Sequence, residues 1–269
     1  VTDVVMHNIF GYVLWPSKVK GSFTAMSSSP PGRPDWNIRH DRIEAWCRAA
    51  KEYGMKIWIV ADAQESIGYF SELISNKIVT PEEGKRIEQE VRNTRRDFYA
   101  RDEKGRIYQS GRYWWALDSR AVIEYWKDLM DELVANYGRH GNLAGIFWDE
   151  IELSLVNDNL GDNLADFQKF CLARFGETYD GQVMPGQTGA DPQNKWWRRE
   201  MLYRSAILTD FMRETNSHAH RKGLQVIRRF QPIMEGNNWT WRCGDTINDA
   251  VALCDYTWQA AGAKKGLDY

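Results

Sequence analysis

The sequence has no excess of charge of one sign and no long apolar run. Its 35 Lys and Arg residues are balanced by 37 Asp and Glu residues, which gives a formal net charge of −2. A protein that binds nucleic acid needs a positive surface, so we expect no nucleic-acid partner. No apolar run approaches the roughly 20 residues that cross a bilayer, so we also expect no membrane partner.

Common metal and cofactor motifs are also missing. The 4 cysteines show no CxxC spacing, and the 5 histidines are scattered along the chain. Neither pattern indicates a zinc site, and no GxGxxG, P-loop, HExxH or GxSxG motif occurs. We therefore expect no metal, no cofactor and buried free thiols. In an oxidising compartment, Cys243 and Cys254 could instead form a disulfide.

Aromatic residues are abundant, with 13 Trp, 12 Tyr and 10 Phe among 269 residues. A core that only needed filling would use Leu and Ile, so the tryptophan count needs a reason. Flat aromatic faces suit the C–H faces of sugar rings and line ligand pockets generally. A Trp-rich core would explain the same count, and the sequence leaves both alternatives open.

A unit of helix, glycine, apolar strand and polar loop recurs along the chain. The predicted helices span about 41–53, 119–137, 196–221 and 246–253. The predicted strands span about 4–6, 55–61, 143–148, 224–230 and 255–259. This alternation predicts an α/β fold with a parallel sheet.

The connection between Asp62 and Ser119 is long. It contains a charged helix from Thr80 to about Arg96 and a predicted β-hairpin over 98–109. Connections of that length without a function are uncommon in compact domains. We interpret 1–269 as a single domain with an inserted helix and hairpin at about 63–117.

Polar residues gather where the predicted strands end, which is the edge that faces the ligand in parallel α/β folds. Asp149 and Glu150 directly follow a buried strand, where two acids are costly to desolvate unless something uses or pairs them. A carboxyl group shielded by Trp148 would have a raised proton affinity, as a general acid requires. Alternatively, Asp149 caps the next segment and Glu150 pairs with a basic residue. Calcium binding by these acids lacks the pattern of a dedicated loop.

Short motifs along the chain resemble a known family. In chain order they are Trp15-Pro16-Ser17, AAKEYGMKIWIVAD, ELVANYGRHGNLAGIFWDEIE, a strand ending in Pro232, and CDYTWQAAG. They resemble glycoside-hydrolase-like TIM barrels of a domain-of-unknown-function type, related in layout to glycoside hydrolase clan A. The resemblance covers most of the chain and implies a (β/α)8 barrel, a carbohydrate substrate and a general acid/base role for Glu150. Clan A enzymes usually have Asn-Glu where this chain has Asp149-Glu150, so the resemblance does not imply the neighbouring sugar-hydroxyl contact.

Strand ends of such a barrel would line the sugar subsites. The resulting candidates for substrate binding are Asn8, Asp62, Trp114, Trp115, Glu152, Arg229, Gln231, Trp258 and Gln259. Trp114 and Trp115 fit two roles equally well, either a sugar platform or a wedge between the hairpin and the barrel.

The resemblance also predicts that the barrel is incomplete within this chain. If Glu150 ends strand four, the predicted strands are two to six, and the nucleophile of strand seven would follow Tyr269. A fragment of a longer chain explains this numbering. A second assignment keeps both carboxylates in the chain, with Asp149 as nucleophile and Asp245 as acid, as in α-galactosidase-like barrels. However, Gly244-Asp245-Thr246 also makes a plain helix cap.

The sequence therefore predicts a glycoside hydrolase that acts on an oligo- or polysaccharide. Glu150 would protonate the leaving oxygen, and Asp149 would orient Glu150 or the substrate. A glycan-binding protein on the same scaffold is the non-enzymatic alternative, and a lyase or isomerase would have only His7 as a weak candidate base.

No signal peptide is found at Val1, so we expect that any export signal was removed or never existed. Secretion or a periplasmic location follows only from the resemblance.

Overall fold

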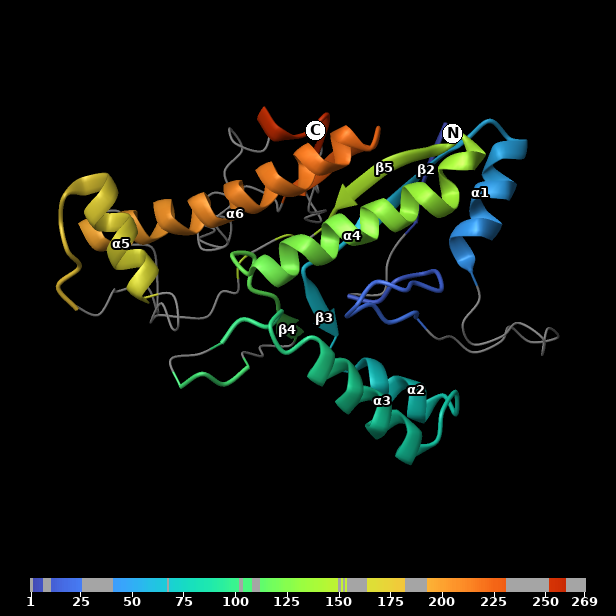
Figure 1. Cartoon of the computed structure of the whole chain (residues 1–269), viewed down its shortest axis with the longest axis horizontal. Helices are drawn as coiled ribbons and strands as arrows, with labels where there is room; N and C mark the ends of the chain where they lie inside the picture. The colour runs from blue at the N-terminus through green and yellow to red at the C-terminus, as the bar shows by residue number, and fades with distance from the viewer. Residues whose placement is uncertain are drawn as a thin grey trace, which may run out of the picture.

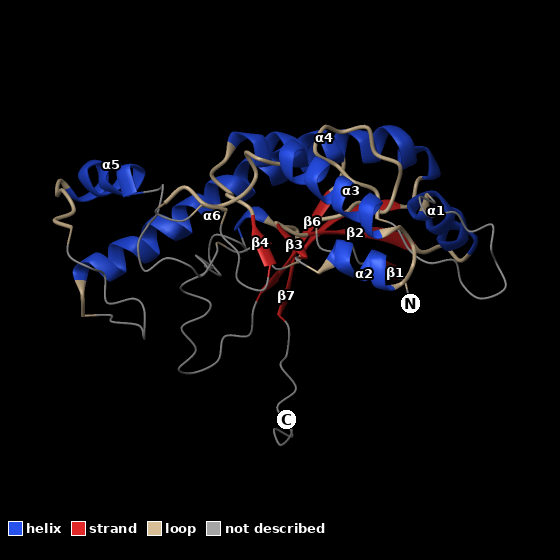
Figure 2. Cartoon of the chain, turned by 90° about the horizontal axis from the view of Figure 1, so that it is seen from below, coloured by secondary structure: helices blue, strands red, loops and turns tan. Residues whose placement is uncertain are grey.

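A five-stranded parallel sheet lies at the centre of the computed structural model (Figures 1 and 2). The structure describes residues 2–6, 11–25, 41–66, 68–101, 104–107, 112–149, 151, 153, 164–181, 193–230 and 252–259, without the side chains of 230 and 257–259. The strands are β1 (Asp3–Met6), β2 (Lys56–Ala61), β5 (Leu143–Trp148), β6 (Gln225–Phe230) and β7 (Tyr256–Gln259). They lie in the order β1-β2-β5-β6-β7, and every neighbouring pair is parallel.

The predicted parallel α/β sheet and its five strands are confirmed, but the sheet is only a partial barrel. Within the described residues, β1 and β7 are not paired with each other, so the sheet is open. The predicted helix over 246–253 falls almost entirely outside the described residues.

Helices cover one face of this sheet, and Figure 2 shows the two longest, α4 and α6, along the same side. The helices outside the 63–117 insert are α1 (Arg42–Glu52), α4 (Arg120–Tyr137), the short 3₁₀ helix η1 (Gly138–His140), α5 (Leu164–Phe175) and α6 (Lys195–Arg221). The Asp41 side chain accepts a hydrogen bond from the Glu44 amide at 2.9 Å, which caps α1 as its sequence predicts. Asn194 caps α6 by accepting from two amides of its first turn.

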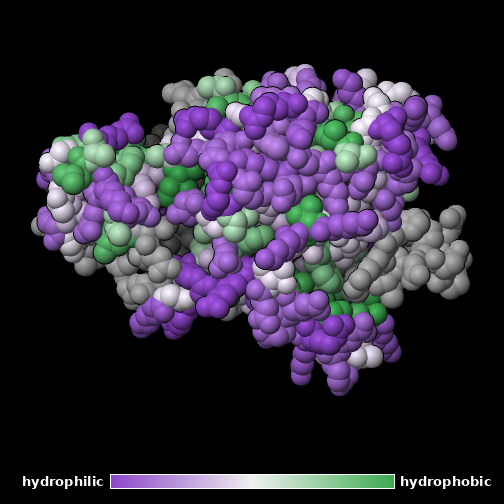
Figure 3. All heavy atoms as spheres, in the orientation of Figure 1, coloured by the Kyte–Doolittle hydropathy of each residue, from purple (hydrophilic) through white to green (hydrophobic). Residues whose placement is uncertain are grey.

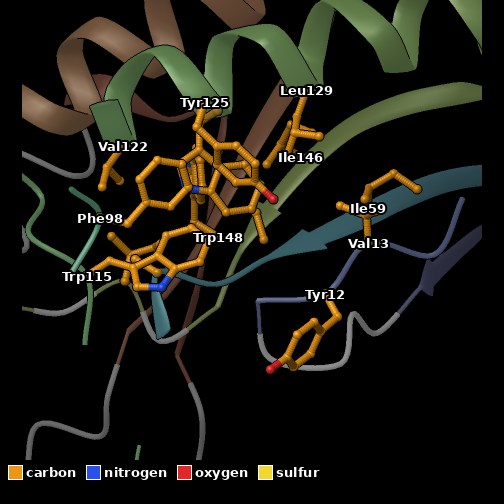
Figure 4. Packing of buried hydrophobic residues seen from close by; sticks show 14 of the residues in the cluster. Tyr12, Val13, Ile59, Phe98, Trp115, Val122, Tyr125, Leu129, Ile146 and Trp148 are labelled. Carbon is orange, nitrogen blue, oxygen red and sulfur yellow. The ribbon is translucent and has the colours of Figure 1, made fainter. Parts of the chain in front are cut away.

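The main core lies between the sheet and these helices (Figure 4). Ile59, Ile146 and Trp148 point toward it from β2 and β5, and all three are buried. The Trp148 ring packs edge-on against Trp126 of α4 and Phe211 of α6, with centroids 5.1 and 5.6 Å apart. Because side chains alternate along a strand, a second, smaller cluster that includes Trp58, Val60 and Phe147 forms on the opposite face.

The connection between β2 and α4 forms a separate unit with its own two-stranded sheet. Its elements are β3 (Gln64–Ser66), α2 (Tyr69–Ser75), α3 (Pro81–Thr94) and β4 (Arg112–Trp114), and β3 pairs antiparallel with β4. Thr80 caps α3, where the sequence predicts a helix start. A described part of the predicted hairpin is the antiparallel bridge between Arg101 and Ile107. The pattern of the sequence did not reveal β3, β4 or α2.

A fully buried ion pair joins this insert to the segment 11–25. The Arg95 guanidinium lies 2.8 Å from the Glu65 carboxylate, and both side chains are 0% exposed. The hydroxyls of Tyr12 and Tyr99 each donate to Glu65 at 3.0 Å, and Arg95 also donates to two backbone carbonyls of the segment 11–25. Burial raises the pKa of both tyrosines well above the usual value, so their hydroxyls remain protonated donors.

Most of the described tryptophans belong to the core. Trp15, Trp58, Trp114, Trp115, Trp126, Trp148, Trp196 and Trp197 are buried, whereas Trp46 is 44% exposed. Among the described residues, the tryptophan excess therefore fills the interior, which is the core alternative that the composition left open.

We expect Glu65→Gln to lower the free energy of unfolding by about 3–5 kcal/mol, because it leaves the buried Arg95 charge without its partner. Urea denaturation would measure this loss. Lys169→Gln is the matched control, because it breaks the exposed ion pair with Asp166 and should cost at most about 1 kcal/mol. Equal effects of the two substitutions would contradict the assigned role of the buried pair.

Candidate active site

The register of the parallel strands aligns their carboxyl ends. Ala61 pairs with Trp148, Trp148 with Arg228, and Arg228 with Thr257. The residues that come next on these four strands are Asp62, Asp149, Arg229 and Trp258, which we call the strand-end row. The Asp149 amide donates to the Ala61 carbonyl at 3.0 Å, so the alignment continues past the end of β5.

The three charged members of the row share the face that points away from the helices. Trp148 points into the main core, where its indole N–H donates to Asn216 at 2.8 Å. Alternation therefore turns Asp149 to the opposite face of the sheet. Val60 and Ile227 of the smaller cluster lie two residues before Asp62 and Arg229, so the same alternation places both charged residues on this face.

An ion pair joins two neighbours of the strand-end row. The Arg229 guanidinium donates to Asp149 Oδ1 at 2.6 Å. The Asp149 side chain is 7% exposed and the Arg229 side chain 27%, so the acid is buried while part of the base reaches the surface. The pair offsets the cost of burying the Asp149 carboxylate, and it leaves the Arg229 side chain partly exposed at the strand-end row.

Asp62 lies on the other side of Asp149 and is only 2% exposed. Two residues further on, the Gln64 side chain accepts a hydrogen bond from Arg112 across the β3–β4 pair at 2.8 Å. The insert thus begins directly at the strand-end row. Gln64 and Arg112 were not predicted as site residues, because only the β3–β4 pairing brings them together. The one available signal was the position of Gln64 just after Asp62.

Several residues predicted for the site lie outside what the structure describes. These are Asn8, Glu150, Glu152 and Gln231, together with His7, Asp245 and Cys243 of the alternative assignments. Trp258 and Gln259 are placed on β7 by their backbone alone. Their roles stay predictions.

Trp114 and Trp115 both come from the end of the insert and are buried. Trp115 is 1% exposed, and its ring lies 5.3 Å from Phe98 and 5.5 Å from Tyr125 (Figure 4). This contact set joins the insert to α4, which is the wedge arrangement. Trp114 is 6% exposed, and its indole Nε1 has no hydrogen-bond partner among the described residues.

The described ranges contain neither a metal-binding cluster nor a membrane-spanning helix. No group of three or more His, Cys, Asp or Glu side chains there could hold a metal ion. No described helix is long and apolar enough to span a membrane. Cys47, Cys171 and Cys254 are free thiols, and burial raises the pKa of Cys47 and Cys254 to about 11.

Solved structures with a similar fold include glycosidases. The β-galactosidase from the psychrophilic Marinomonas ef1 matches with a TM-score of 0.58 and 12% identity, over 97% of this chain and 36% of that chain. The β-galactosidase from Bacillus circulans sp. alkalophilus matches with a TM-score of 0.56 and 12% identity, over 100% and 37%. The catalytic domain of β-amylase from Paenibacillus polymyxa matches with a TM-score of 0.54 and 11% identity, over 96% and 69%.

These matches show a fold shared with TIM-barrel glycosidases. This chain spans little more than a third of the length of the two β-galactosidase chains. No family model matches the sequence. No curated protein matches it either.

We expect Asp149 and Arg229 to be energetically coupled. Arg229→Gln should destabilise the fold by leaving a buried carboxylate unpaired, and adding Asp149→Asn should recover part of the loss. A double-mutant cycle in urea should give a coupling energy of about 0.5–3 kcal/mol. Strictly additive single effects would mean that the two side chains do not form this pair in solution.

Proposed function

We propose that the strand-end row is part of the active site of a glycoside hydrolase built on a (β/α)8 barrel. The observation that carries this proposal is the Asp149–Arg229 ion pair beside Asp62, on one face and at the carboxyl edge of a parallel sheet. This edge is where enzymes with parallel α/β sheets and barrels bind their substrates. The shared fold with β-galactosidases and a β-amylase supports an oligo- or polysaccharide as the substrate.

Glu150 is the proposed general acid. It follows Asp149 directly, so this role requires that strand alternation ends at Asp149 and that both carboxyl groups face the ligand edge. Glu150 would then donate its proton to the glycosidic oxygen as the bond to the anomeric carbon breaks. Asp149 is already bound to Arg229, so its role in this scheme is to position the strand end or a sugar hydroxyl. Arg229 supplies the counter-charge that makes a buried Asp149 tolerable, and through its partly exposed side chain it would contact the sugar.

Hydrolysis of a glycoside also requires a second carboxylate. Retaining enzymes place the two carboxyl groups about 5–5.5 Å apart, and inverting enzymes about 6.5–9.5 Å apart. We infer that the second group comes from a strand that the described sheet does not include. The pairing of Asp149 with Asp245 is the alternative that stays within these 269 residues.

The remaining strand-end residues are proposed to bind the sugar hydroxyls and ring faces. Gln259 would hydrogen-bond hydroxyls, and Asp62, which is 2% exposed, would support the row from a buried position. Trp258 follows Arg229 in the strand-end row, where an indole would stack on a sugar ring. Asn8, Glu152 and Gln231 belong to the same proposal. Trp115 is a core residue in the structure, so the proposal does not use it.

Glu150→Gln should abolish sugar release from a panel of plant, algal and host glycans, with a loss of about 10²-fold or more. The amide keeps the shape of the side chain but has no acidic proton, so glycan binding should survive. Reducing-sugar release and calorimetric binding would be measured on the full-length protein. Glu52→Gln is the matched control, because it makes the same change at an exposed position at the end of α1 and should leave turnover unchanged.

Glycan binding without turnover in both the wild type and Glu150→Gln would support the glycan-binding alternative instead. Turnover that survives Glu150→Gln but is lost in Asp149→Asn would assign the acid/base role to Asp149 instead of Glu150. An intact mass well above 31.3 kDa would support a longer chain.

A further inference from the structure

A cavity of about 220 Å³ lies between the segment 17–24 and the helix α3. Figure 1 shows both parts on the same side of the molecule, with the segment in blue and α3 in green-blue. From α3 the lining comes from one helical face, which runs from Arg86 to Thr94. None of the described charged residues of the strand-end row lines this cavity, so it is a separate site.

The cavity has apolar groups in its lining. Ile87 and Val91 of α3 are 3% and 6% exposed, and the partly buried Phe23 joins them from the facing segment. Phe23 is held in place by edge-on contacts with Tyr12 and Phe70, with ring centroids 6.0 and 5.9 Å apart. The outer surface over α3 is mainly hydrophilic (Figure 3), so these apolar groups are set among polar neighbours.

Four hydroxyl groups also line the cavity, and their protons are not all used in the same way. Ser22, Thr24 and Thr94 donate to backbone carbonyls at 2.7, 2.8 and 2.9 Å. Each of these oxygens therefore keeps lone pairs that can accept a further hydrogen bond. Ser17 Oγ accepts from the Val19 amide at 3.2 Å, which leaves its proton able to donate.

The charges that line the cavity cancel. Arg86 and Glu90 form an ion pair at 3.2 Å, and both side chains are about two-thirds exposed, at 67% and 69%. An anionic ligand would meet the Glu90 carboxylate and three hydroxyl oxygens that act as acceptors. A ligand with several O–H donors and no net charge fits this set better.

We propose that this cavity binds one neutral pyranose ring, with its C–H face on the partly exposed Phe23 and its hydroxyls on the polar groups that make up most of the exposed lining. The volume supports one ring rather than a chain, because pockets for drug-sized ligands occupy about 300–1,000 Å³. The Phe23 ring supplies the apolar contact, and the hydroxyls and ion pair supply orientation. The site goes beyond the proposed hydrolytic function and does not depend on it.

The test is a titration with methyl β-D-galactopyranoside and methyl β-D-glucopyranoside, followed by saturation-transfer difference NMR. Thr94→Phe should fill the cavity and weaken the binding of at least one glycoside about tenfold or more. Asn93→Phe is the matched control, because it adds the same ring at the neighbouring exposed position, outside the cavity lining, and should leave binding unchanged. Both variants change exposed residues near the end of α3, and their thermal unfolding would be compared with that of the wild type.

Three results would overturn the proposal. They are no saturable binding of either glycoside, equal binding by the wild type and Thr94→Phe, and competition by sodium sulfate, which would indicate an anion site. Binding that is lost in Arg229→Gln but kept in Thr94→Phe would place the sugar at the strand-end row. That result would support the proposed function and reject this cavity, so the two failures can be told apart.

Discussion

The parallel register of β2, β5 and β6 determines what the chain presents at the edge of its sheet. A slip of one residue in a strand exchanges its two faces, so Asp149 would enter the helix-covered core and Trp148 would leave it. Gly145 helps to fix this register, because a Cβ atom there would collide with the backbone of Gln225 on β6. The strand-end row therefore depends on a close backbone approach four residues earlier in β5.

Two ion pairs with different surroundings serve the structure of the insert and the proposed active site, respectively. Glu65 and Arg95 are fully sealed, and two tyrosine hydroxyls and two backbone carbonyls complete their hydrogen bonds. No ligand can reach that pair, so it serves to hold the insert against the segment 11–25. In the pair of Asp149 and Arg229, the acid is buried, but 27% of the Arg229 side chain remains exposed. A charge that is both fixed in position and accessible is what a polar substrate requires.

The sequence predicted the elements that have a clear hydrophobic pattern or a helix cap. It missed the short strands that form only by pairing with a distant part of the chain. The runs 55–61 and 143–148 are apolar except for Lys56, so they indicated buried strands, and Asp41 and Thr80 indicated helix starts. β3 has three residues, too few to show alternation, and it pairs with a strand about fifty residues away. The partner of Asp149 was hidden for the same reason, since only the register of β5 and β6 brings Arg229 beside it. The strand ends could be located, but their contacts could not.

The insert connects the two proposed sugar sites. It begins at the strand-end row, and its helix α3 forms one wall of the cavity. The buried Glu65–Arg95 pair fixes the segment 11–25, which supplies the other wall, so the cavity is held by the same contacts that seat the insert. Together, the two proposed sugar sites on one chain would favour a long glycan over a short one. Once a glycan occupies one site, its effective concentration at the other site is raised, provided that the glycan is long enough to span both. In that geometry a monosaccharide gains nothing from the second site, and a polysaccharide gains affinity without any new contact at the strand-end row.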